Sequence, residues 1–127
     1  MKTKLSFLTK KFSTIFFFAL IMFFANLSNA QTTYTWVGGS TGVWTTASNW
    51  SPAVVPGAAT DIVAFNDGGT YTITGISNRT IRKLLVTNNT NVTLYSSSTS
   101  VQALTLNGPA YEDNLLIENG STLQLGP

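Results

Sequence analysis

The sequence predicts an all-β fold, a right-handed parallel β-helix, which is also called a β-solenoid. Between Asp61 and Leu125, couplets of apolar residues with one residue between them return at intervals near twenty residues. Such couplets are typical of strands, and a constant interval indicates stacked repeat units. Polar turns rich in Asn and Gly separate the couplets. A small β-sandwich is the alternative, because short strands separated by turns at eight-to-twelve-residue spacing fit it too.

The couplets fall into two predicted columns. The first is Ile62/Ala64, Leu84/Val86, Leu104/Leu106 and Leu123/Leu125, and the second is Tyr71/Ile73, Val92/Leu94 and Leu115/Ile117. In both columns the first members of successive couplets keep a separation near twenty. Asn66, Asn88 and Asn107 follow first-column strands, and they form either an asparagine ladder inside the fold or ordinary exposed turns.

Residues 1–30 have the pattern of a secretory signal peptide. Four lysines in the first eleven residues precede an uninterrupted apolar run, residues 15–25, and Ser28 and Ala30 are small residues suited to cleavage. Eleven apolar residues are too few to cross a bilayer core, which needs about twenty. We therefore expect cleavage after Ala30, no transmembrane segment afterwards, and a secreted or cell-surface location.

Removal of the signal peptide leaves residues 31–127, enough for one small domain. Three basic and five acidic residues remain, so the net charge becomes negative, which excludes the basic surface that nucleic acid requires. There is no Cys, so disulfides cannot stabilise the domain, and no His to act as a base or ligand. Stacked backbone ladders are the expected source of stability.

Residues 31–60 carry three tryptophans, Trp36, Trp44 and Trp50. Each indole has a large apolar face and one N–H donor, so a cluster of them suits a compact aromatic pack. We expect this segment to be an N-terminal cap that covers the first coil, with coils following in residues 61–127. The alternative is that the three rings are exposed and bind a glycan.

The same region resembles a known family. The resemblance rests on Trp36-x-Gly38-Gly39, Trp44, Asn49-Trp50-Ser51, Val55-Pro56-Gly57 and Asp61-Ile62-Val63. This pattern is similar to the amino-terminal region of large secreted bacterial proteins of Bacteroidetes type, the adhesin-like and autotransporter-passenger-like β-helix repeat proteins. The resemblance implies an aromatic block followed directly by a β-solenoid. It brings no catalytic residues.

The sequence contains little support for chemistry. The five carboxylates do not converge: Glu112 and Asp113 are adjacent and would point to opposite faces of a strand. The turn at Asn66–Gly69 lacks the repeated nonapeptide of calcium-binding coils. We therefore expect no catalytic residue, no metal site and no cofactor.

The predicted function is a non-catalytic, exported structural or adhesin-like surface segment whose partners are host or environmental glycans or surface proteins. The alternatives are a carbohydrate-binding module using Trp36, Trp44 and Trp50, and the front part of a polysaccharide-active β-helix enzyme. Since Gly126 and Pro127 fall in the middle of a predicted coil, we also expect the chain to be a fragment.

Overall fold

The computed structural model describes residues 30–98 and 102–126. The predicted signal peptide, apart from Ala30, lies outside the described residues. The chain divides after Ala30, and every described element belongs to the unit that begins at Gln31. The elements are β1 (Thr32–Trp36), β2 (Thr41–Val43), the 3-10 helix η1 (Ala47–Asn49), β3 (Trp50–Ser51), β4 (Asp61–Phe65), β5 (Thr70–Ile76), β6 (Arg79–Ile81), β7 (Lys83–Val86), β8 (Asn91–Ser96), β9 (Leu104–Leu106), β10 (Leu115–Ile117) and β11 (Thr122–Leu125).

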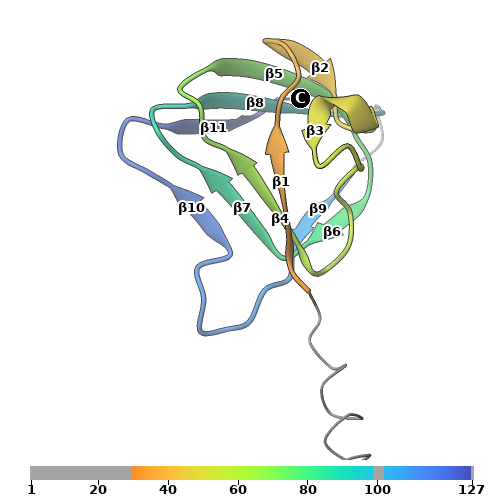
Figure 1. Cartoon of the computed structure of the whole chain (residues 1–127), viewed down its shortest axis with the longest axis vertical. Helices are drawn as coiled ribbons and strands as arrows, with labels where there is room; N and C mark the ends of the chain where they lie inside the picture. Colours follow the sequence, from red (N-terminus) through yellow and green to blue (C-terminus); the bar gives the residue numbers. More distant parts are fainter. Residues whose placement is uncertain (1–29, 99–101, 127) are drawn as a thin grey trace, which may run out of the picture. The chain divides into compact units, whose positions relative to one another are not determined.

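The described strands form three sheets. The first has the order β10-β7-β4-β1-β3, the second β11-β8-β5-β2, and the third pairs β6 with β9. Figure 1 shows β1, β4, β7 and β10 running side by side. Neighbouring strands are parallel except for β1 and β3, which are antiparallel. All three sheets contribute side chains to one apolar core, so each sheet buries one face against the others.

This arrangement corrects the predicted fold class. A right-handed parallel β-helix of coils with a constant period was expected, but the first sheet is mixed. The interval between paired residues is also not constant. Val63 pairs with Leu84, which keeps the expected spacing, whereas Leu84 pairs with Leu115, at a spacing nearly half as long again. The regular β-solenoid is therefore not formed. The β-sandwich alternative stays a prediction, since the two larger sheets share a core although most of their strands pair in parallel.

The predicted columns were wrong from residue 104 onward. Leu104/Leu106 forms β9, which pairs with β6 instead of β7. Leu115/Ile117 forms β10, which pairs with β7 and so belongs with Leu84/Val86. Leu123/Leu125 forms β11, which pairs with β8. The physical reason is that the loops before and after β9, residues 97–103 and 107–114, are longer than those before and after β6, its partner in the preceding pass. They lengthen the interval between β7 and β10, which the prediction had taken as constant.

The first couplet was displaced by one residue. Ile62 was assigned to the core-facing couplet, but it is only half-buried, whereas Val63 and Phe65 are fully buried and pair with Leu84 and Val86. Since side chains alternate between the two faces of a sheet, a shift of one residue exchanges the buried and outward sets. The preceding Asp61 is also buried, although it is charged. The buried residues of this strand are therefore not all apolar, and the pattern of apolar residues did not reveal which face is buried.

Three equivalent turns lie above one another, after β4, β7 and β10. A residue with positive φ stands at the same place in each, Gly68 (83°), Asn89 (57°) and Gly120 (84°), as a left-handed corner requires. Thr90 is buried between them: its hydroxyl accepts from Gly68 N–H at 3.0 Å, and its own N–H donates to Ser121 Oγ at 3.2 Å. Side-chain bonds thus hold the turns in the register of the strands.

The asparagine ladder does not form inside the fold. Asn66, Asn88 and Asn107 are all exposed. The Asn88 side-chain amide donates to the backbone oxygen of Asn66 at 3.2 Å, which links two turns on the surface. The second expectation, ordinary exposed turn asparagines, is the one the structure has.

The three tryptophans belong to the core. Trp36, Trp44 and Trp50 are 3%, 0% and 1% exposed. Trp50 packs edge to face against both others, with ring centroids 5.0 Å from Trp36 and 4.8 Å from Trp44. Its indole N–H donates to the Trp44 carbonyl at 2.8 Å, and Trp44 in turn donates to the Pro56 carbonyl at 3.2 Å. Both of these buried N–H groups therefore have an acceptor, as burial demands.

The predicted cap is therefore not separate from the sheets. Trp36 ends β1, which pairs in parallel with β4, and β2 pairs in parallel with β5. Gly38 and Gly42 lie directly against the Trp36 ring, where a Cβ atom would come within 2.6 Å of it. These two glycines are thus needed to admit this ring.

We expect Trp50→Ala to destabilise the fold severely. Removal of a large buried aromatic typically costs ~3–5 kcal/mol of unfolding free energy, and here it would also leave the Trp44 carbonyl without its donor. Thermal unfolding followed by far-ultraviolet circular dichroism would show a strongly lowered melting temperature or no folded signal. The matched control is Val54→Ala, because Val54 is exposed and its truncation should change stability by less than about 0.5 kcal/mol. Equal melting temperatures for the two variants would contradict the core role of Trp50.

Candidate functional site

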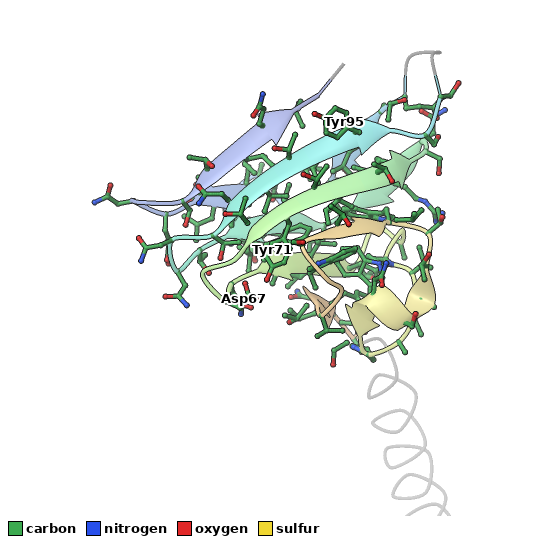
Figure 2. The ribbon with its side chains drawn as sticks, turned by 90° about the horizontal axis from the view of Figure 1, so that it is seen from above. Asp67, Tyr71 and Tyr95 are labelled. Atoms are coloured by element: carbon green, nitrogen blue, oxygen red, sulfur yellow. The ribbon has the colours of Figure 1, made fainter. Side chains whose placement is uncertain are left out.

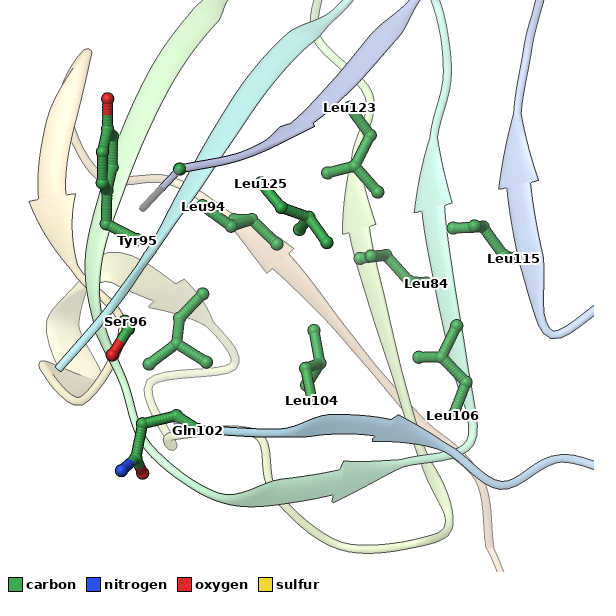
Figure 3. Close-up of a pocket in the computed structure, with 12 residues that line it drawn as sticks. Leu84, Leu94, Tyr95, Ser96, Gln102, Leu104, Leu106, Leu115, Leu123 and Leu125 are labelled. Carbon is green, nitrogen blue, oxygen red and sulfur yellow. The ribbon is translucent and has the colours of Figure 1, made fainter. Parts of the chain in front are cut away.

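The three sheets end together at an open apolar cavity. β9, β10 and β11 are each the last strand of their sheet, with a described neighbour on one side only. Between them lies a cavity of about 340 Å³, lined mainly by leucines. Figure 3 shows Leu84, Leu94, Leu104 and Leu123 directed into it from different sheets. The volume lies at the lower end of the range of small-molecule sites, about 300–1,000 Å³.

The side chains around this opening are unusually exposed for their type. Leu115, Leu116 and Ile117 of β10 are 44%, 37% and 41% exposed, and Leu125 of β11 is 74% exposed. The residues that pair with Leu115, Ile117 and Leu125 one strand further in, Leu84, Val86 and Leu94, are buried. Of these exposed residues, Leu115 and Leu125 line the cavity, and exposed apolar side chains at a cavity mark a place where another molecule or segment binds.

The backbone of β10 also faces outward at this end. Leu84 N–H donates to the Asn114 carbonyl at 2.9 Å, and Glu118 N–H donates to the Val86 carbonyl at 3.0 Å. Because alternate residues of a parallel strand bond to the same neighbour, the N–H and C=O groups of Leu115 and Ile117 point away from β7.

The same alternation holds at the other two edges. In β11, Thr122 and Gly126 donate to β8 and its preceding turn, so the backbone groups of Leu123 and Leu125 point outward. In β9, the bonds from Arg79 to Ala103 and from Asn107 to Ile81 leave those of Leu104 and Leu106 outward. On each edge strand, the residues with outward backbone groups are also the apolar ones of the couplet.

The rim of the opening is acidic. No Lys or Arg follows Lys83 in the sequence, whereas Glu112, Asp113 and Glu118 all do. Arg82 neutralises Glu112 through two bonds of 2.8 Å, one to each carboxylate oxygen. Asp113 and Glu118 stand just before and just after β10, and both are exposed. The edge strand therefore has an uncompensated negative charge near each end.

The residues predicted to bind a glycan lie elsewhere. Trp36, Trp44 and Trp50 pack against one another and do not line the cavity at β9, β10 and β11. A sugar ring stacks on the exposed face of an aromatic side chain, and these faces are covered by neighbouring groups.

Sequence reasoning missed the leucines of the open end as a site, because it assigned β10 and β11 to the wrong columns. A better signal exists in the turns: Asn66-Asp67-Gly68, Thr87-Asn88-Asn89 and Glu118-Asn119-Gly120 each follow a strand directly. Alignment of these turns yields the pairing that the structure has.

Most carboxylates are engaged in local structure. Asp61 is buried and accepts the backbone N–H groups of Gly57 and Ala58, both at 2.8 Å, which secures the loop before β4. One oxygen of Glu118 accepts Asn88 N–H at 3.1 Å. Among residues 30–98 and 102–126 there is no group of three potential metal ligands.

Asp67 and Tyr71 form the most perturbed titratable pair that the structure describes, labelled in Figure 2. The Tyr71 hydroxyl donates to Asp67, whose other oxygen accepts Gly69 N–H at 3.0 Å. Burial, reinforced by the hydrogen bond and the charge of Asp67, raises the pKa of Tyr71 from 10.0 to about 12. The hydrogen bond from Tyr71 lowers the pKa of Asp67. The pair fixes the turn between β4 and β5.

Within the described ranges, no helix has the length and apolar character needed to cross a bilayer. No family model matches this chain, and neither a curated protein nor a solved structure matches it.

The Asp67–Tyr71 pair predicts a pH dependence of stability. Since the pKa of Tyr71 is raised on folding, its contribution is fully present below pH 10.0 and is lost as the pH rises toward about 12. Since the pKa of Asp67 is lowered on folding, its contribution is present at neutral pH and is lost as the pH falls through the folded-state pKa.

Ultraviolet difference titration of the chain against Tyr71→Phe measures this tyrosine directly. We expect ionisation near pH 12. In Asp67→Asn the pKa of Tyr71 should fall but stay above 10.0, because burial, the larger cause, remains. Circular dichroism at each pH ensures that the folded state is the one titrated. Ionisation of Tyr71 near 10.0 in the folded chain would contradict the described contact.

Proposed function

We propose that residues 31–127 are a non-catalytic structural or adhesin-like segment of an exported bacterial surface protein. The observation that carries the proposal is the open end, where three sheets present outward backbone groups and exposed leucines around one apolar cavity. Strand edges of this kind are suited to pairing with further polypeptide. The basic and apolar pattern of residues 1–30 supports export.

The placement of the acidic residues supports the non-catalytic part of the proposal. Acid–base catalysis needs groups that converge on one cavity with suitable pKa values. Asp61, Asp67, Glu112 and Glu118 each bond to a structural partner, and none of the five carboxylates lines the cavity. A mainly apolar lining offers little to hold a charged cofactor or metal.

Glycans and surface proteins remain the proposed classes of partner. Of the two, protein has the stronger support, because the open end presents backbone donors and acceptors in strand spacing. Glycan binding would need an exposed aromatic face, and Trp36, Trp44 and Trp50 offer none.

Surface display can be tested in cells that produce the protein. An antibody raised against residues 31–127 should label intact cells, and protease added outside should remove the signal, because an exported segment is accessible without lysis. A form lacking residues 1–30 is the matched control and should be labelled only after lysis. Labelling of the unaltered protein only after lysis would contradict the proposal.

A further inference from the structure

We infer that the open end binds an extended polypeptide strand of a second protein, with alternating apolar side chains and Lys or Arg near both of its ends. The inference deepens the proposed function, on which it rests, by naming the chemistry of the partner. It follows from three properties of the same edge: its backbone, its cavity and its charge.

The backbone requires an extended partner. Leu115 and Ile117 turn their N–H and C=O groups outward at the strand spacing of about 3.3 Å per residue, two residues apart. An added β-strand satisfies such a row of groups, whereas a helix cannot, because its own backbone groups are already bonded.

The cavity requires apolar side chains at alternate positions of that strand. The side chains of Leu115, Leu104 and Leu123 line the cavity from the three edge strands. A strand laid along β10 directs every second side chain to the same face as Leu115, into this space. Its remaining side chains face the solvent and have no need to be apolar.

The rim charge selects a basic partner and disfavours a second copy. Asp113 and Glu118 flank β10, and among the described residues the only ion pair is that of Arg82 with Glu112, so neither carboxylate has a basic partner. Two copies joined through their open ends would bring the carboxylates of both copies together, and like charges at short range repel. A strand with Lys or Arg at both ends would instead form an ion pair at each end of β10.

The test uses two dye-labelled probes with the full chain. One is a short peptide of alternating valine and threonine with lysine at both ends, and its matched control has glutamate at both ends. By fluorescence anisotropy at low salt, the lysine peptide should bind about fivefold more tightly, since an exposed ion pair contributes up to about that factor. The double variant Asp113→Asn/Glu118→Gln should remove the preference.

Two further measurements locate the site. Amide chemical-shift changes on binding should concentrate in β9, β10 and β11. Ile117→Pro removes one outward N–H without breaking the bonds between β10 and β7, so it should abolish binding while circular dichroism shows the fold retained.

Absence of binding, equal binding of the two peptides, shift changes elsewhere, or association of the chain with itself through these strands would each overturn the inference. Failure of the peptide test with intact surface labelling rejects only this partner. Failure of surface labelling with successful peptide binding rejects only the surface role.

Discussion

The structure depends on keeping successive passes of the chain in register, strand upon strand and turn upon turn. β4 pairs with β7 and β7 with β10, while β5 pairs with β8 and β8 with β11. Both ladders stay in register only if the turns that join their strands have the same length. Gly68, Asn89 and Gly120 have positive φ at the same place in each turn, so the chain makes the same corner three times. Buried Thr90 bonds to the turn on each side, so a change in one turn is felt in the next. Parallel ladders stabilise this domain in place of disulfides, which a chain without cysteine cannot form.

The two ends of these ladders are finished differently. At one end, β1 is covered by the antiparallel β3, whose Trp50 packs between Trp36 and Trp44. Pro52 follows directly and has no N–H to offer to a further strand. At the other end, β10 and β11 expose Leu115 and Leu125, whose partners in β7 and β8, Leu84 and Leu94, are buried. The same core is therefore closed by aromatic packing on one side and left accessible on the other.

The sequence predicted the strands better than their partners. Couplets such as Tyr71/Ile73 and Val92/Leu94 do pair with each other, because the turns that precede them, residues 66–69 and 87–90, have equal length. From Leu104 onward the prediction was wrong, since a spacing near twenty was extended across a segment where Leu84 and its partner Leu115 are much further apart in the chain. Hydrophobic spacing alone cannot detect such an insertion, because Leu-x-Leu couplets look alike on any sheet. The tryptophans were recognised as a pack, but their role as part of the sheets depended on pairings of β1 and β2 over long distances in the chain.

The acidic rim also resolves a conflict that the open end creates. Long apolar edges with unpaired backbone groups promote indiscriminate association, which proteins limit with short edge strands and with charge. Here β9 and β10 have only three residues each, and Asp113 and Glu118 stand beside β10. Their charges repel another copy of the same edge, which carries the same sign, and attract a strand that brings basic residues. In the proposed interaction, charge therefore supplies selectivity that leucines alone cannot provide.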